Sequence, residues 1–142
     1  MHDTTKTRMP LLTPEQREQL LANGRQSGRD HVPVVKFFNP VGIGTWLATE
    51  LDAGGDILFG LAQLNDAPEL GSYSLEELAT LELPFGMHIE RDLFFTGTYP
   101  ISAYAEVARE TGSITAAIRI LSNASGARSG EGSDALPPLA KT

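Results

Sequence analysis

The stretch ELGSYSLEELATLELPFGMHIERD, residues 69–92, holds the densest run of structural signals in the chain. Within it, Glu77 follows Ser74 by three positions, the spacing of a capping box in which the serine caps the helix and the glutamate bonds back to it. The pattern predicts a helix of two turns. Leu-Pro-Phe-Gly at 83–86 ends that helix, because proline and glycine both interrupt helical backbone. A charged strand is predicted to follow at 87–95.

Similar signals mark the elements that come earlier in the chain. Thr13 and Gln16 form another capping box around Pro14, so a helix is predicted from Pro14 to about residue 22. Asn23-Gly24 is predicted to end this helix in the left-handed conformation. Runs rich in β-branched and aromatic residues, separated by turn signals, predict strands at 32–38, 45–51, 57–64 and 69–73.

The C-terminal third is predicted to be helical and then irregular. Apolar residues at helical spacing after Pro100 give an amphipathic helix that ends at Gly112. Residues 113–121 suit either a helix or a strand, and their alanines favour the helix. Serine, glycine, alanine and proline dominate 122–142, which predicts a disordered C-terminal tail.

Composition sets the class of protein. A chain of 142 residues with 41% hydrophobic residues can form one core without metals or disulfides. We therefore predict a flexible N-terminus at 1–10 and a single α+β domain at 11–121, with a mostly antiparallel sheet of four or five strands and three or four short helices. No apolar run approaches the roughly 20 residues that cross a bilayer, and no secretion signal is visible, which predicts a cytoplasmic protein. The absence of cysteine excludes disulfide scaffolds, thiolate metal sites and cysteine nucleophiles.

The net charge of −7 comes entirely from the middle of the chain. Residues 37–90 contain nine acids and no lysine or arginine, whereas 1–36 have six bases and four acids and 91–142 have five of each. Such a span repels a phosphate backbone and attracts a basic groove, so direct nucleic-acid binding through it is disfavoured. It is either a solvated acidic face or a surface that docks on a basic partner. The candidate partner-binding residues are Glu50, Asp52, Asp56, Asp66, Glu69, Glu76, Glu77, Glu82 and Glu90.

The charged strand at 87–95 offers a second candidate site. Residues two apart on a strand share a face, so His88, Glu90 and Asp92 are predicted to line one side. A histidine with two carboxylates can hold a divalent metal or carry out acid–base chemistry, and the alternative is a plain solvated strand face. Arg91 either clamps a phosphate or carboxylate or, as we expect, pairs with Glu90, Asp92 or an acid on the next strand.

Other patterns give weaker signals. Gly42-Ile43-Gly44 lacks the third glycine of a dinucleotide-binding fingerprint and is interpreted as a turn. A DNA-binding role would need one shared face for the early basic residues, Arg8, Arg17, Arg25, Arg29 and Lys36. The aromatic residues of the predicted strands are not interleaved with bases, which argues against a platform for single-stranded nucleic acid. We predict that these aromatic residues belong to the core: Phe37, Phe38, Trp46, Phe59, Phe94 and Phe95.

Seven segments together resemble one protein family. They are LLTP (11–14), PVVKFF (33–38), WLATE (46–50), DILFGL (56–61), ELGS (69–72), LEEL (75–78) and IERD (89–92). In combination they resemble the bacterial family known as domain of unknown function 2958, over about residues 11–110. The resemblance implies an accessory product of conjugative plasmids, integrated elements or phages, with no established reaction or cofactor and no catalytic residues to carry over.

Charge and resemblance lead to one functional hypothesis and one alternative. Small non-enzymatic proteins of mobile elements often blunt host defences that target DNA, such as CRISPR or restriction. The hypothesis is therefore a non-enzymatic protein-binding accessory of a mobile genetic element, without a cofactor, whose acidic surface imitates DNA on a basic host surface. The alternative is a small metal-dependent enzyme that uses His88, Glu90 and Asp92.

Overall fold

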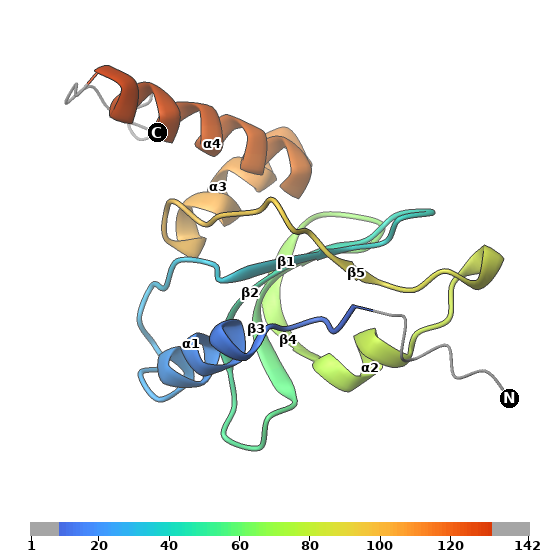
Figure 1. The fold of residues 1–142 in the computed structure, drawn as a ribbon. Helices are drawn as coiled ribbons and strands as arrows, with labels where there is room; N and C mark the ends of the chain where they lie inside the picture. The colour runs from blue at the N-terminus through green and yellow to red at the C-terminus, as the bar shows by residue number, and fades with distance from the viewer. Residues whose placement is uncertain (1–8, 132–142) are drawn as a thin grey trace, which may run out of the picture.

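One five-stranded antiparallel sheet lies at the centre of the molecule, in a computed structural model that describes residues 9–131 (Figure 1). Its order is β4-β3-β2-β1-β5, so β4 and β5 are the two edges. The strands are β1 (Val35–Phe38), β2 (Thr45–Leu51), β3 (Ile57–Gln63), β4 (Glu69–Ser74) and β5 (Glu90–Arg91). The helices are α1 (Pro14–Gly24), α2 (Leu75–Thr80), α3 (Ile101–Thr111) and α4 (Ile114–Glu131), with a 3-10 turn, η2 (Pro84–Gly86). The predicted fold class, a single α+β domain with an antiparallel sheet, is confirmed.

Helices cover both faces of the sheet. In Figure 1, α1 and α2 lie below it and α3 and α4 above it. Successive side chains of a strand point to opposite faces, and the central strands β2 and β3 contribute to two cores in this way. Phe37 and Trp46 are buried on the side of α1 and α2, whereas Leu47 and Leu61 are buried with α3 and α4. The sheet is therefore apolar on both sides at its centre.

Helix α1 begins as predicted and ends differently. Thr13 Oγ1 accepts the Gln16 N–H at 3.0 Å and Gln16 Oε1 accepts the Thr13 N–H at 2.9 Å, which confirms the capping box. The left-handed ending at Gly24 is wrong, because Gly24 is absent from the positive-φ glycines of the described chain. Gly24 instead lies against β2, where an added Cβ would overlap the Leu51 carbonyl oxygen. Glycine is required there for close approach.

Helix α2 is capped from two directions. Ser74 Oγ accepts the Glu77 N–H at 3.1 Å, so the serine half of the predicted capping box is confirmed, but among the described residues the return bond to the Glu77 side chain is not formed. A second carboxylate comes from the β2–β3 turn, where Asp56 accepts the Glu76 N–H at 2.8 Å and the Ser74 hydroxyl at 2.8 Å. The start of α2 is thus fastened to a turn about 20 residues earlier.

The strand predicted at 87–95 is wrong in length, since only Glu90 and Arg91 pair with β1. Before the strand, the chain leaves the η2 turn, where Phe85 and Gly86 adopt positive φ angles of 64° and 70°, and residues 87–89 form no ladder with β1. After it, the Asp92 carboxylate accepts the Phe94 N–H at 2.9 Å and turns the chain. The strand predicted at 32–38 is likewise shortened, to the four residues of β1.

The aromatic residues of these segments divide between core and surface. Phe37 and Trp46 are buried as predicted, and Phe38, Phe59 and Phe95 are half-buried. The prediction for Phe94 is wrong, because its side chain is 93% exposed. The turn at Asp92 directs this ring away from the core.

The C-terminal helices meet the sheet through β3. Residues 114–121 are helical as favoured, with Ser113 directly before the helix, and α4 continues to Glu131. Gln63 fixes the junction, because its amide donates to the Gly112 carbonyl at 2.8 Å and accepts the Ile114 N–H at 2.9 Å. The disordered tail predicted from residue 122 is therefore helical as far as 131, since no proline interrupts α4 and an existing helix extends readily. The rest of that tail, 132–142, and residues 1–8 of the predicted flexible N-terminus lie outside the described residues.

None of the helices in the described part of the chain has the length and apolar character needed to cross a bilayer.

Candidate functional site

The nine candidate acids lie on separate parts of the molecule. Asp52 and Asp56 occupy the β2–β3 turn, and Asp66 occupies the β3–β4 turn. These turns are at opposite ends of β3. Glu69 and Glu90 are further separated, because they lie on the two edge strands β4 and β5. The acids therefore do not form one continuous surface.

Four of these acids do come together, and we name this group the acidic end: Asp52, Asp56, Glu76 and Glu77. Asp52 Oδ1 accepts the Asp56 N–H at 3.0 Å, and Asp56 Oδ1 accepts the Glu76 N–H at 2.8 Å, so a chain of contacts links the turn to α2. The pKa of the Asp52 carboxyl lies below its usual range, mainly because the carboxylate accepts the Ile57 N–H and, to a smaller extent, because it accepts the Asp56 N–H. Asp52 and Asp56 thus shape the backbone, whereas the exposed side chains of Glu76 and Glu77 leave their charges available to solvent.

Basic residues adjoin the acidic end and reduce its charge. The Arg17 guanidinium lies beside Gly55 of the β2–β3 turn, 3.5 Å from the position of an added Cβ. Arg29 lines a shallow hollow with Glu50 and Asp52. Glu50 itself is largely buried, with its carboxylate 3.9 Å from His31 Nε2. The acidic end keeps a net negative charge, and its outward part is Glu76 and Glu77.

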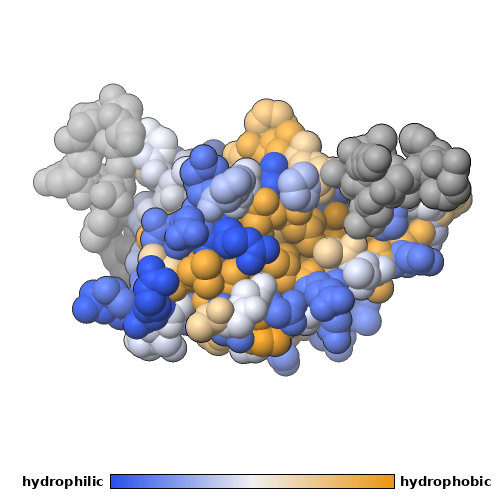
Figure 2. Space-filling model, turned by 60° about the horizontal axis from the view of Figure 1, so that its bottom comes forward, coloured by the Kyte–Doolittle hydropathy of each residue, from blue (hydrophilic) through white to orange (hydrophobic). Residues whose placement is uncertain are grey.

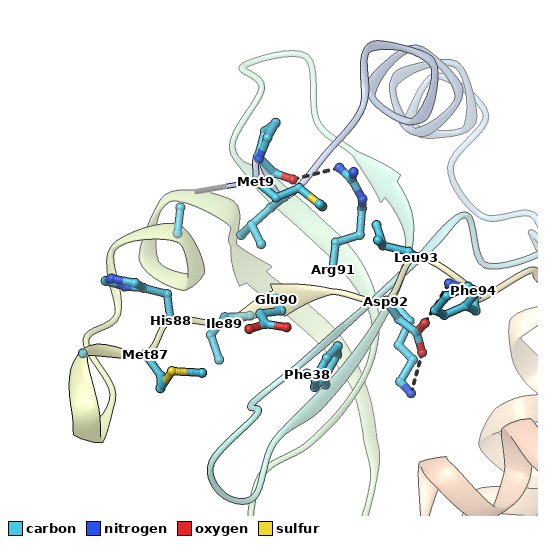
Figure 3. Close-up of a pocket in the computed structure, with 15 residues that line it drawn as sticks. Met9, Phe38, Met87, His88, Ile89, Glu90, Arg91, Asp92, Leu93 and Phe94 are labelled. Carbon is cyan, nitrogen blue, oxygen red and sulfur yellow. Dashed lines mark hydrogen bonds and ion pairs between the residues drawn. The ribbon is translucent and has the colours of Figure 1, made fainter. Parts of the chain in front are cut away.

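The structure does not assemble His88, Glu90 and Asp92. His88 precedes β5, and its ring points away from the two carboxylates, with Nδ1 3.4 Å from the Leu81 carbonyl oxygen (Figure 3). Asp92 is paired with Lys36, whose Nζ lies 3.0 Å from Oδ2. Among the described residues, no three histidine, aspartate or glutamate side chains are grouped so that they could hold a metal ion.

Arg91 has a different partner from the one predicted. Its Nη1 donates to the Pro10 carbonyl at 2.8 Å, and within the described residues no carboxylate lies within ion-pair distance of it. The pairing with Glu90, Asp92 or an acid on the next strand is therefore wrong. Arg91 points to the opposite side of β5 from Glu90 and Asp92, and the neighbouring strand β1 carries no acid (Figure 3).

A groove of about 1030 Å³ runs along β5, and we name it the β5 groove. It is lined by residues 9–11, Lys36 and Phe38 of β1, Ala79 of α2, and residues 86–94 (Figure 3). Met9, Leu93 and Phe94 leave 52%, 58% and 93% of their surface exposed, so large apolar side chains are gathered along this groove. Figure 2 shows that hydrophobic surface also gathers on the underside of the molecule, bordered by hydrophilic residues.

The groove was missed by sequence reasoning because its walls come from four separate segments. For one of these segments, 86–94, the local sequence does indicate the observed turn. Asp92 two residues before Phe94 fits a turn in which the carboxylate accepts a backbone N–H, which would have moved Phe94 out of the predicted core.

The early basic residues do not share a face in the described chain. Arg17 lies on α1 beside the β2–β3 turn, whereas Lys36 lies in the β5 groove and is paired with Asp92. Arg8 lies outside the described residues. This arrangement gives no support to the DNA-binding interpretation.

Comparison with known proteins identifies a family. Searches of curated proteins and of solved structures gave no match. The sequence profile of a family described as "Protein of unknown function (DUF2958)" matches residues 11–115, which include α1, the entire sheet, α2 and α3. This match covers most of the chain and agrees with the resemblance of the seven segments, so the chain belongs to the DUF2958 family.

Proposed function

We propose that this protein is a non-enzymatic binding protein, an accessory of a mobile genetic element, and that its acidic end docks on a basic surface of a host protein. The hypothesised target is a nucleic-acid-binding defence complex, of the CRISPR or restriction type, whose DNA-binding surface the carboxylates block. The single observation that carries the proposal is the placement of Glu76 and Glu77 at the exposed start of α2, beside Asp52 and Asp56.

The positions of the acidic residues fit a contact limited to one small area of the surface better than a contact that runs along the whole molecule. DNA presents phosphates along a continuous path, whereas the nine acids here are spread over three strands, two turns, helix α2 and the segment that follows it. The proposed contact is therefore confined to the acidic end. Its attraction to a basic surface is long-range and screened by salt, since the Debye length is about 8 Å at physiological ionic strength.

The experiment measures DNA cleavage by purified restriction and CRISPR complexes as this protein is added. We expect one of these complexes to be inhibited, and added salt to weaken the inhibition. Charge reversal by Glu76→Lys with Glu77→Lys is expected to raise the inhibitory concentration at least about tenfold, because two charge pairs become repulsive.

A matched control separates position from net charge. Asp66→Lys with Glu69→Lys changes the net charge by the same amount at the other end of β3, and inhibition should persist. Asp52 and Asp56 are unsuitable for this test because they hold backbone N–H groups. Full inhibition by the Glu76 and Glu77 double variant, or none by the unmodified protein, would refute the proposal.

A further inference from the structure

Strand β5 is an edge strand whose outer side has no neighbour among the described strands. The Asp92 N–H donates to the Lys36 carbonyl at 3.0 Å, and Glu90 is paired with Phe38. In an antiparallel ladder alternate residues bond to the same partner, so the N–H and C=O of Arg91 point away from β1. This edge offers a backbone donor and a backbone acceptor to an extended chain.

The β5 groove follows this edge on both faces of the strand. Phe38 lies on the side of Glu90, and Met9 lies on the side of Arg91 (Figure 3). An extended peptide directs successive side chains to alternate sides, so its side chains would meet Phe38 on one side and Met9 on the other. A groove of this shape with open backbone groups suits strand addition, in which main-chain hydrogen bonds hold the peptide and pockets select its side chains.

The charged side chains beside the groove indicate which peptide side chains it would accept. On the Glu90 side, Asp92 is neutralised by Lys36, whose Nζ also lies 5.6 Å from the centre of the Phe38 ring. Glu90 is exposed, and its carboxylate has no hydrogen bond or ion pair with any described residue. The unmatched charge on this side is therefore one carboxylate, which favours a basic side chain opposite it.

A second copy of the chain fits this edge poorly. Arg91 directs its backbone groups outward, and the same alternation extended by one residue directs those of Ile89, just before β5, outward as well. Two copies of β5 could then pair side by side in two antiparallel registers centred on the strand. One register sets Glu90 opposite the Glu90 of the other copy, and the second sets Glu90 opposite its Asp92. The first register is destabilised because like charges lie directly opposite each other, and in the second Lys36 is already paired with Asp92, so neither register offers Glu90 a free basic partner.

We propose that the β5 groove binds an extended segment of a protein partner, which adds to the sheet beside β5 and places a basic side chain against Glu90. The β5 groove and the acidic end share no residue, so peptide binding by the groove and docking through the acidic end can each fail without the other.

The test titrates the full chain with two synthetic peptides of about eight residues, one alternating valine with lysine and the other valine with glutamate, followed by backbone amide NMR. The lysine peptide should shift the amide signals of Ile89, Arg91 and Leu93 and bind roughly tenfold more tightly than the glutamate peptide. Glu90→Lys should reverse this preference. Because Glu90 is exposed, this variant is expected to fold.

Two variants at one position test the backbone contact. Arg91→Ala and Arg91→Pro both remove the guanidinium contact with Pro10, but only proline also removes the outward N–H. We expect the proline variant to lose at least about tenfold more affinity for the lysine peptide than the alanine variant.

Several results would overturn the inference. They are equal binding of the two peptides by the unmodified chain, shifts centred on α2 that disappear in the Glu76 and Glu77 double variant, and equal affinities of the two Arg91 variants. A dimer that buries β5 in sedimentation and NMR experiments would also overturn it, in favour of a second copy as the occupant.

Discussion

Asp56 is the residue that connects the hairpin turn to helix α2. Its carboxylate accepts the Glu76 N–H and the Ser74 hydroxyl, both at 2.8 Å, and its backbone carbonyl accepts the Leu75 N–H at 2.8 Å. Asp56→Ala removes the two side-chain contacts, and we expect it to lower the unfolding free energy by about 1–2 kcal/mol, the range for a lost helix cap. Urea denaturation measures this. Asp66→Ala, in a turn where the carboxylate accepts no hydrogen bond from a described residue, should change stability by less than about 0.5 kcal/mol.

Asp92 makes the stability depend on pH. Partial burial alone would raise the pKa of the Asp92 carboxyl. The Phe94 N–H and the Lys36 ammonium together lower this pKa by more than burial raises it, so it lies below its ordinary value of 3.8. A depressed folded-state pKa stabilises the fold above the unfolded value and loses that contribution as pH falls through the folded value.

The corresponding prediction concerns Asp92→Asn. Between about pH 6 and pH 2, the variant should lose less unfolding free energy than the unmodified protein, because it has no carboxylate to protonate. Lys36→Met should give an intermediate slope, since the Phe94 N–H remains. Urea denaturation across this pH range measures both. A slope in Asp92→Asn equal to that of the unmodified chain would show that this contact contributes nothing.

At the scale of the element, two glycines that face each other on neighbouring strands should respond differently to replacement by alanine. Gly60 of β3 lies opposite Gly71 of β4. A Cβ at Gly60 would overlap the Leu47 carbonyl oxygen of β2, whereas a Cβ at Gly71 meets nothing within 4 Å. Gly60→Ala should therefore destabilise by about 3 kcal/mol or more through forced backbone movement. Gly71→Ala should be neutral or stabilising by about 0.5 kcal/mol, because alanine restricts the unfolded chain. Equal thermal unfolding of the two variants would contradict this.

The elements that sequence reasoning placed correctly are those with local causes. The capping box at Thr13 and Gln16 and the end of α3 at Gly112, whose φ is 80°, depend on residues within one turn of each other. The length of β5 depends instead on a turn at Asp92 and on register with β1. The role of Gly24 depends on β2, which is distant in sequence. A local sequence pattern cannot predict the contact between Gly24 and β2.

At the scale of the whole molecule, the candidate sites were the least predictable feature. The sequence showed how many acids lie between Lys36 and Arg91, but the order β4-β3-β2-β1-β5 decides which of them meet. It brings Asp52 and Asp56 to α2 and sends Glu69 and Glu90 to opposite edges. The β5 groove depends on the same topology, because it joins the segment before α1 to the edge strand.

The last prediction concerns how much of α4 the fold requires. The buried residues of this helix include Ile114, Ala117 and Leu121, and none of the described side chains after Leu121 is buried. Asn123→Ala, at an exposed position of the same helix, should therefore keep the unfolding free energy of the full chain within about 0.5 kcal/mol. Leu121→Ala in the full chain should lower it by about 2–5 kcal/mol, because it opens a cavity between α4 and the sheet. Chemical denaturation of both proteins measures the difference. A loss in Asn123→Ala as large as that in Leu121→Ala would show that the stabilising contacts of α4 are not confined to its buried side chains.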